Sequence, residues 1–297
     1  MKRAEEYLQI WNQARGSLRA GAKVAVVGCG ASGMHLAYFL HARGFAVTVF
    51  DSRQRSGVRV PLVHACHTVK RRAPLWEKAA TFARAWYTQD HQPSGIIESH
   101  HNDSGIYFNI RLRGYLSFWK KRLMGSGVTF RHESIATETP LPGFDLTFFA
   151  KGSATHSLPV TRTIPGWESY FSSFGAPAEK ANIGKNGNKI TNYIYLVPRA
   201  GFIHRNDETA ETAANFAAAV HPTGRKALFY GERLTTRDRF PVVGASGEIW
   251  LFCAMGYHAL TYTPYLAQAV AAHLAGDRIT DENLISTLTP ARFIPRQ

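Results

Sequence analysis

Hydrophobic positions near the start of the chain follow two different patterns. Residues 24–27 form a continuous apolar run, and after three glycines the apolar positions recur in helical fashion at Met34, Leu36, Ala37 and Leu40. A short continuous run predicts a buried strand, whereas the later spacing predicts a helix that ends at Gly44. A second apolar segment, residues 46–50, predicts another strand. The chain therefore opens with a predicted strand–helix–strand unit over residues 23–51.

Three glycines, Gly28, Gly30 and Gly33, occupy the turn between the predicted first strand and the helix. The first permits a sharp turn, the second lets the backbone approach a pyrophosphate, and the third lets the helix pack closely on the sheet. Asp51 follows the second strand, where a carboxylate accepts hydrogen bonds from a ribose diol. This order predicts a dinucleotide site, and the fingerprint is common to FAD and NAD. Its candidate residues are Gly28, Gly30, Ala31, Ser32, Gly33, Asp51, Ser52 and Arg53.

The pattern along the rest of the chain predicts two lobes. Helices are expected over residues 74–89, 113–124 and 265–274, with strands such as "GIYFNI", "VTFRH" and "FDLTFFAKGS" between them. Residues 154–230 differ, because Pro, Gly, Asn and Ser are frequent and short strands are interrupted by an alanine-rich helix over 209–220. We therefore expect an α/β Rossmann-like lobe, discontinuous in sequence, and a smaller, mostly antiparallel α+β lobe.

The expected boundaries follow from these patterns. A leader comes first. Three segments of the nucleotide-binding lobe follow, and two segments of the smaller substrate lobe separate them. The leader is 1–22, the nucleotide-binding lobe comprises 23–72, 113–153 and 231–297, and the substrate lobe comprises 73–112 and 154–230.

Composition narrows the class of protein. No apolar run approaches the ~20 residues that a membrane-spanning helix needs, and Glu5 and Glu6 occupy the position where a secretion signal needs an apolar core. The three cysteines, Cys29, Cys66 and Cys253, form no CxxC pair, which argues against a disulfide framework and a zinc site. We expect a cytoplasmic protein with no membrane partner and no metal site.

The formal net charge is +14, from 35 Lys and Arg against 21 Asp and Glu. A field of this sign attracts polyanions such as nucleic acid, and a solvated basic surface is the alternative. The charge does not decide between them. The candidate phosphate contacts are two clusters, Lys70, Arg71 and Arg72, and Lys120, Lys121 and Arg122.

The C-terminal part carries a second set of motifs. "GERLTTRDRFPVVG" is followed by "IWLFCAMGYHALTYTPYLAQAV" and ends in "LTPARFIPR". An N-terminal dinucleotide fingerprint completed by strands near the C-terminus resembles the D-amino-acid-oxidase-like FAD enzymes, which include glycine oxidase. The C-terminal motifs are similar to those of the FAD-dependent half of the bifunctional tRNA 5-methylaminomethyl-2-thiouridine biosynthesis (MnmC) family. The resemblance covers roughly residues 22–60 and 225–297 and implies FAD as the cofactor.

The resemblance also assigns residues to the flavin. A strand that delivers Gly256 and a helix that begins near Thr263 and Pro264 would direct free backbone N–H groups at the edge of the ring that gains negative charge on reduction. A plain strand-to-helix turn is the alternative interpretation of this segment. The added cofactor residues are Gly152, Gly256, Tyr257, His258, Ala259 and Leu260.

Arg233, in the G-x-R motif, is the candidate substrate-binding residue. The resemblance implies that its guanidinium binds the substrate carboxylate with two parallel hydrogen bonds. Tyr257 and His258, which differ from the family's residues in the segment near the flavin, are the other candidate catalytic residues. The alternative is a salt bridge to Asp238 or Glu232. Arg237 and Asp238 are expected to brace their turn.

The family reaction removes the carboxymethyl group from 5-carboxymethylaminomethyl-(2-thio)uridine at the tRNA wobble position. Hydride transfer to the flavin and hydrolysis of the imine give glyoxylate and a primary amine. tRNA is the expected partner, and because no methyltransferase half is present, a separate methyltransferase would act on the same nucleotide. The chain departs from the family at "RSGVRVPLVH" and "GYHAL", at Asp51 in place of the more frequent Glu, and in its shorter second lobe. Two alternatives stay open: a small-molecule amine or amino-acid oxidase, and a non-catalytic FAD- or RNA-binding module.

Overall fold

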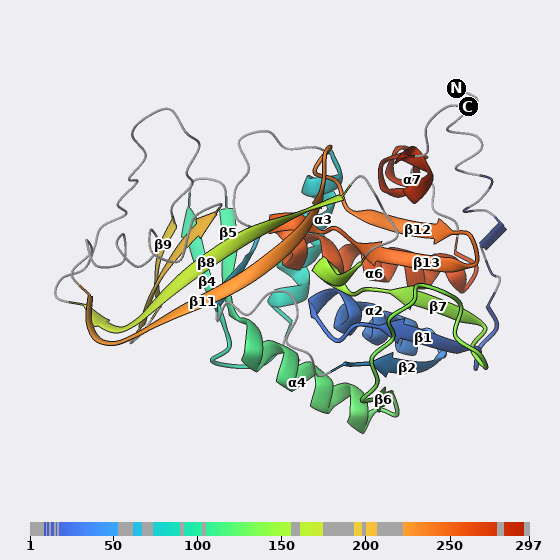
Figure 1. The fold of residues 1–297 in the computed structure, drawn as a ribbon, viewed down its shortest axis with the longest axis horizontal. Coiled ribbons are helices and arrows are strands. Elements are labelled where there is room, and N and C mark those ends of the chain that lie inside the picture. The colour runs from blue at the N-terminus through green and yellow to red at the C-terminus, as the bar shows by residue number, and fades with distance from the viewer. Residues whose placement is uncertain are drawn as a thin grey trace. The chain divides into compact units, whose positions relative to one another are not determined.

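The computed structural model divides the chain into two units (Figure 1). The first comprises Met1–Gln54, Val63–Arg162 and Leu234–Gln297, and the second comprises Arg55–Leu62 and Thr163–Arg233. The described residues are 9, 11, 13–14, 16, 18–52, 62–66, 74–89, 92–102, 105–155, 161–174, 193–197, 200–206, 222–277 and 282–293.

A six-stranded sheet forms the centre of the first unit, with the order β12-β13-β7-β1-β2-β6. Neighbouring strands run parallel, except that β12 is antiparallel to β13. The C-terminal strand β13 lies beside β7, so the chain's end completes the sheet that its beginning started. The bounds are β1 Lys23–Val27, β2 Ala46–Phe50, β6 Thr129–Arg131, β7 Leu146–Phe149, β12 Val242–Ser246 and β13 Ile249–Cys253.

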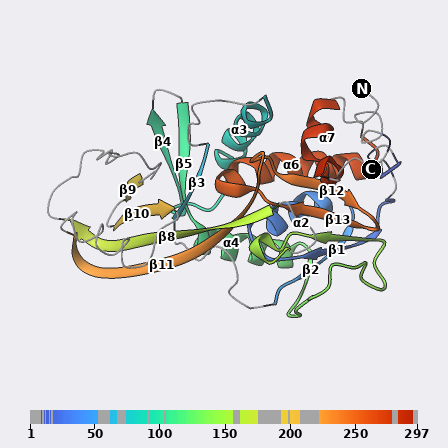
Figure 2. The same ribbon diagram turned by 45° about the horizontal axis from the view of Figure 1, so that its top comes forward.

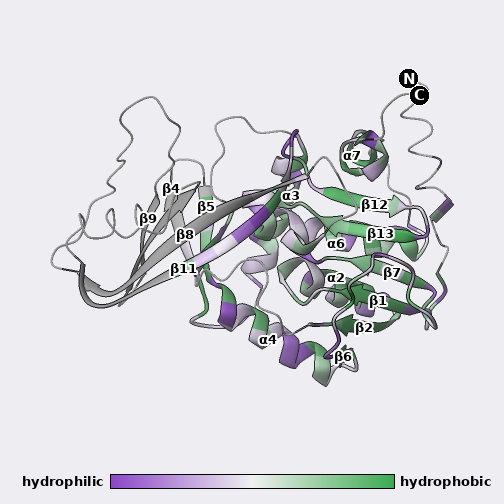
Figure 3. Ribbon diagram, viewed as in Figure 1, coloured by the Kyte–Doolittle hydropathy of each residue, from purple (hydrophilic) through white to green (hydrophobic). Residues whose placement is uncertain are grey.

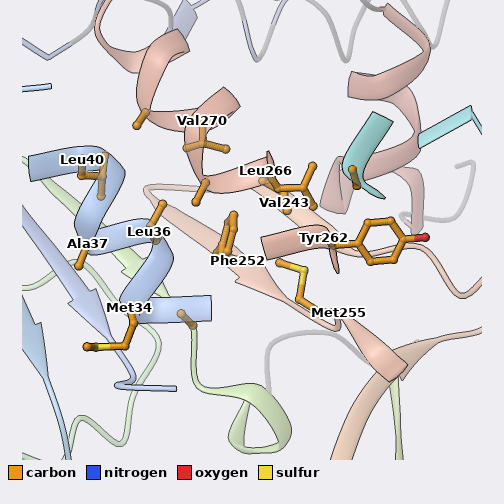
Figure 4. Packing of buried hydrophobic residues seen from close by; sticks show 14 of the residues in the cluster. Met34, Leu36, Ala37, Leu40, Val243, Phe252, Met255, Tyr262, Leu266 and Val270 are labelled. Atoms are coloured by element: carbon orange, nitrogen blue, oxygen red, sulfur yellow. The ribbon is translucent and has the colours of Figure 1, made fainter. Parts of the chain in front are cut away.

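Both faces of this sheet are buried, which explains why its strands are continuous apolar runs rather than alternating ones. Val24 and Val26 belong to the large cluster that packs under helices α2 (Ala31–Ala42) and α6 (Ala259–Leu274), whereas Ala25 and Val27 belong to a second cluster. Figure 3 shows β1, β7 and β13 as mainly hydrophobic. Figure 4 shows side chains of α2 and α6 in one cluster with Phe252 of β13. The predicted Rossmann-like α/β architecture is confirmed.

The remaining elements of the first unit flank this core. Helices α3 and α4 match the two predicted middle helices within about two residues. A three-stranded sheet has the order β3-β5-β4, with β4 and β5 antiparallel. The bounds are α3 Pro74–Tyr87, α4 Leu112–Gly125, α7 Glu282–Leu288, β3 Leu62–Ala65, β4 Ile97–Asn102, β5 Gly105–Arg111 and the short 3-10 helices Gly152–Ala154, Gly256–His258 and Pro290–Phe293.

Residues 73–112 belong to the first unit, whereas the sequence-based division assigned them to the substrate lobe. The physical reason is the apolar face of α3, which includes the buried residues Trp76, Ala80 and Ala83 and joins the same core cluster as Leu266 of α6. A helix that buries this face against the nucleotide-binding lobe is part of that lobe's core.

The second unit contains a four-stranded sheet with the order β11-β8-β10-β9 (Figure 2). β10 (Ala200–Asn206) is antiparallel to both β8 (Thr161–Phe174) and β9 (Tyr193–Val197), as predicted, and β11 spans Pro222–Thr236. The helix expected over 209–220 lies outside the described residues. Across the described part of the chain, no helix combines the length and apolar character needed to cross a membrane.

Candidate functional site

The candidate site lies at the edge of the six-stranded sheet where the parallel strands β1, β2, β7 and β13 have their carboxyl ends. Open α/β sheets bind ligands at this edge. The glycine turn follows β1, Asp51 follows β2, and Gly152 follows β7 after two residues. Gly256 comes three residues after β13. The structure thus brings most of the predicted cofactor residues to one edge.

The three fingerprint glycines have distinct structural reasons. Gly28 has φ +118, and a Cβ there would lie 2.5 Å from the Ala150 oxygen at the end of β7. A Cβ on Gly33 would overlap the oxygen of Gly28, so this residue sets how closely α2 approaches the turn. Gly30 differs from both, because its φ is −82 and a Cβ there would meet none of the described residues within 4 Å.

The open space at Gly30 lies at the N-terminus of α2, where Gly30 is the N-cap residue. Within the described residues no side chain caps this helix, and its first turn carries no acidic residue. The amides of Ala31, Ser32 and Gly33 precede the first helical hydrogen bond, which runs from Met34 to Gly30. A pyrophosphate fits this arrangement, because the helix end offers N–H groups and a positive partial charge beside Gly30, where none of the described residues lies within 4 Å of an added Cβ.

Asp51 is fixed beside this turn by main-chain and side-chain contacts. Its N–H donates to the Arg131 oxygen at 2.9 Å, and its Oδ2 lies 3.3 Å from the Nζ of Lys120 on α4. Burial first, and then the charge of Asp51, raise the pKa of the neighbouring Cys29 thiol to about 11. The structure therefore gives Lys120, expected among the nucleic-acid contacts, an ion pair with the candidate ribose-binding carboxylate.

The other predicted basic residues are distributed differently. Lys121 and Arg122 are exposed on α4, and the Arg122 guanidinium lies 5.6 Å from the centre of the Trp119 ring. Arg53 and the cluster Lys70, Arg71 and Arg72 lie outside the described residues.

The segment before α6 is a 3-10 helix over Gly256–His258, in which Gly256 has φ +59. Tyr257, His258 and Ala259 are half-buried and Leu260 is buried. The His258 ring lies 6.3 Å from that of Trp76 and 6.1 Å from that of Tyr262. α6 begins at Ala259, so the expected start near Thr263 and Pro264 is wrong. The helix end that could serve a cofactor is formed by residues 256–260.

A buried polar network, not foreseen from the sequence, holds this first turn of α6. The Nδ1 atom of His35 on α2 lies 2.7 Å from Thr263 Oγ1, and its Nε2 atom lies 2.7 Å from Tyr115 Oη. Burial lowers the pKa of His35 to about 3, so the ring is neutral and donates through one nitrogen only. The network ties α6 to helices α2 and α4 through side chains that lie within the core.

Two further bonds reach the same turn from other elements. The N–H of Cys66 donates to Thr261 Oγ1 at 2.8 Å, and the hydroxyl of Tyr87 on α3 donates to the Leu260 oxygen at 2.8 Å. The position of residues 259–263 is therefore determined by partners on α2, on α3 and at Cys66, the residue after β3. Preorganisation of this kind suits a segment that must hold a ligand in one geometry.

Arg233 lies on β11 in the second unit and is half-buried. Of the two carboxylates named as alternative partners, Glu232 accepts a hydrogen bond from Tyr230 at 2.6 Å, and Asp238 accepts from Arg292 Nε at 2.9 Å. Burial alone would raise the pKa of Asp238, but its bonds from Arg292, Thr236 and the Phe240 amide lower it. Asp238 thus braces its turn, as expected.

Among the residues that the structure describes, no three His, Cys, Asp or Glu side chains converge as metal ligands do. The three cysteines are free, and burial is the first cause that raises the pKa of Cys66 and Cys253 to about 12.

Comparisons with a family model and with solved structures support the Rossmann-like fold described above. Residues 26–67 match a family described as the NAD(P)-binding Rossmann-like domain. Glycine oxidase from Geobacillus kaustophilus aligns with a TM-score of 0.66 at 14% identity, over 92% of this chain and 100% of that one. The chain has the glycine-oxidase fold.

Other solved structures share this glycine-oxidase fold. Glycine oxidase from Bacillus cereus aligns with a TM-score of 0.62 at 13% identity, over 92% of this chain and 100% of its own. Iminodiacetate oxidase from a Chelativorans species aligns with a TM-score of 0.59 at 14% identity, over 90% of this chain and 99% of its own. No curated protein matches the chain in sequence.

Proposed function

We propose that this chain is an FAD-dependent oxidoreductase that acts on the CH–NH group of an amine carrying a carboxylate. The observation that carries the proposal is the open space at Gly30, at the uncapped N-terminus of α2 and one strand away from Asp51, in a chain with the glycine-oxidase fold. The match to an NAD(P)-binding Rossmann-like domain supports a dinucleotide there. The fold comparison favours FAD.

Each part of the site would have a separate role. The amides of Ala31, Ser32 and Gly33 would bind the pyrophosphate, and Asp51 would accept hydrogen bonds from the adenosine ribose. Residues 256–260 would contact the flavin, and Tyr257 and His258 are the candidate catalytic residues among them. Bound FAD would supply the redox chemistry by accepting a hydride from the carbon beside the amine. Arg233 would bind the substrate carboxylate through its two parallel donors.

We propose, further, that the amine belongs to tRNA, as 5-carboxymethylaminomethyl-(2-thio)uridine at the wobble position. Support comes from the motifs of residues 225–297, which are similar to those of the tRNA-modifying family, and from the net charge of +14. Exposed Lys121 and Arg122 remain candidates for tRNA phosphate contacts, together with Lys70, Arg71 and Arg72. The primary amine released with glyoxylate would then be a substrate for a separate methyltransferase.

A small-molecule amine is the second candidate substrate. One of the similar structures is an iminodiacetate oxidase. Iminodiacetate is a secondary amine with the same N-carboxymethyl group as the modified uridine. The two candidates therefore share the bond that is oxidised and differ in what the amine is attached to.

An anaerobic reduction experiment separates these functions. The FAD-loaded protein is mixed either with tRNA that carries the carboxymethylaminomethyl group or with iminodiacetate, sarcosine or glycine, and the flavin absorbance is followed. We expect the modified tRNA to bleach the flavin and to release glyoxylate. Bleaching by free amines alone would identify a small-molecule oxidase. Flavin that no substrate reduces would contradict catalysis and favour the non-catalytic module.

A further inference from the structure

Side chains from helix α4 and from the glycine turn lie near the Asp51 carboxylate in the first unit. Lys120 of α4 places its Nζ 3.3 Å from Asp51 Oδ2 and 5.3 Å from the centre of the Phe130 ring of β6. Cys29, in the glycine turn, is close enough for the charges of both Asp51 and Lys120 to affect the pKa of its thiol. The side chains of Asp51 and Lys120 are 25% and 27% exposed, so both ends of the pair are largely shielded from water.

The backbone around this pair is held in place. β2 and β6 are paired with Phe50 opposite Arg131, and the next residue, Asp51, donates its N–H to the Arg131 oxygen. Lys120 follows the buried Trp119, which anchors α4. The Lys120 side chain, which comes from helix α4, thus lies between the Asp51 carboxylate and the Phe130 ring. An exposed lysine, in contrast, keeps its charge mobile in solvent.

The Asp51–Lys120 ion pair bears on the proposed role of Asp51, which is to bind the ribose of the cofactor. A carboxylate that accepts from two ribose hydroxyls must keep one orientation, and an ion pair restrains that orientation. A carboxylate near a pyrophosphate also repels it, and a cation on the same carboxylate offsets this repulsion. The raised pKa keeps the Cys29 thiol protonated, so it adds no further negative charge.

We propose that Lys120 is a positioning residue for the cofactor, which fixes and neutralises the Asp51 carboxylate so that it binds the ribose of the adenosine half. This inference rests on the proposed binding of FAD. It assigns to Lys120 a function in the cofactor site and removes it from the candidate tRNA contacts.

The chain offers a matched control in the next residue. Lys121 has the same side chain on the same helix, but it is exposed. Lys120→Met and Lys121→Met therefore remove the same charge from neighbouring positions, and only the first change removes a partner of Asp51.

The experiment measures FAD affinity of the apoprotein for the wild type, Lys120→Met, Lys121→Met, Asp51→Asn and the double variant Lys120→Met with Asp51→Asn. We expect Lys120→Met to weaken FAD binding by about tenfold, the equivalent of one lost charge-assisted contact of about 1.4 kcal/mol. Lys121→Met should change FAD affinity by less than about twofold, since surface charges contribute little. The double variant should bind FAD like Asp51→Asn, because Lys120 acts through Asp51.

A second readout tests recognition of the ribose itself. ADP and 2′-deoxy-ADP are compared as competitors of FAD, and the wild type should prefer ADP because only ADP offers both hydroxyls. Lys120→Met should lose most of this preference. A merely structural role would lower both affinities equally, and the melting temperature of each apoprotein shows that the variants are folded.

Two results would overturn the inference while the proposed function stands. The first is a wild type that binds FAD while Lys120→Met and Lys121→Met bind it equally well. The second is a Lys120→Met protein with weaker binding but the wild-type preference for ADP over 2′-deoxy-ADP. A wild type that binds no FAD would overturn the proposed function and this inference with it.

Discussion

The hydroxyl of Tyr87 donates a hydrogen bond to the main-chain oxygen of Leu260, 2.8 Å away. Pro264 lies four residues further along α6 and has no N–H, so the Leu260 oxygen lacks its helical donor. Tyr87 is 4% exposed and supplies the donor from α3. The start of α6 thus keeps its helical path through a proline, and the segment expected at the flavin is tied to a neighbouring helix.

Replacement of Tyr87 by Phe should lower the free energy of unfolding by about 1–3 kcal/mol, because a buried carbonyl loses its donor. Chemical denaturation of the two proteins measures the difference. Pro264→Ala restores an N–H to the helix, so the same Tyr87→Phe change should cost less in that background. Equal costs in both backgrounds would show that Tyr87 does not act by replacing the missing helical bond.

His35 makes stability dependent on pH in a direction set by its burial. The folded pKa is about 3 and the ordinary value is 6.5, so below pH 6.5 the unfolded chain binds a proton that the folded protein does not. The contribution of neutral, buried His35 to the free energy of unfolding is therefore fully present above pH 6.5, and it is lost as the pH falls toward 3. The slope should reach about 1.4 kcal/mol per pH unit.

Denaturation of the wild type and His35→Gln between pH 7 and about pH 4.5 tests this expectation. Glutamine retains polar atoms for hydrogen bonding but has no proton to gain, so the variant should lose stability more slowly as the solution is acidified. Parallel curves for the two proteins would rule His35 out as the source of the slope.

Arg233→Ala should leave the flavin spectrum intact and weaken the apparent affinity for a carboxylate-bearing substrate by about 10- to 100-fold, the loss of one charge-assisted pair. Arg233→Lys should recover only part of it, because an ammonium cannot form the two parallel bonds. Arg237→Ala, which changes an exposed arginine of the same region, is the control. Steady-state kinetics that show the same effect for Arg233→Ala and Arg237→Ala would refute the carboxylate role.

The first βαβ unit could be predicted from the sequence because every local signal in it agrees. The apolar run over 24–27, the glycine turn, the helical spacing and the second apolar run each indicate the same elements, and the structure has them within a residue or two. Agreement of this kind requires no knowledge of the rest of the chain. The assignment of residues 73–112 failed because the partner of the α3 face is α6, far away in sequence.

The start of α6 could not be placed from local rules. A proline commonly lies in the first helical turn, so Pro264 suggested a beginning several residues too late. What permits a proline inside the helix is the Tyr87 hydroxyl, a tertiary contact that sequence spacing does not reveal.

Lys120 and His35 did leave signals in the sequence. Lys120 lies one helical turn after Leu116, on the flank of the buried face, whereas Lys121 does not. α2 has no Asp, Glu, Lys or Arg over 31–42, which indicates a helix buried nearly all round, where a histidine must find hydrogen-bond partners. Neither signal names the partner, because Asp51, Thr263 and Tyr115 come from distant segments.

FAD binding at Gly30 is tested by equilibrium titration with FAD of the apoproteins of the wild type, Gly30→Val and Gly33→Ala. Among the described residues a Cβ at Gly30 would meet nothing within 4 Å, so Gly30→Val should stay folded, with at most the small loss of stability of a poorer N-cap, but lose FAD, whose pyrophosphate would occupy that space. Gly33→Ala should lower the melting temperature, since its Cβ would overlap the Gly28 oxygen. We expect a folded Gly30→Val protein without flavin, and full FAD occupancy in that variant would show that the pyrophosphate does not bind at Gly30.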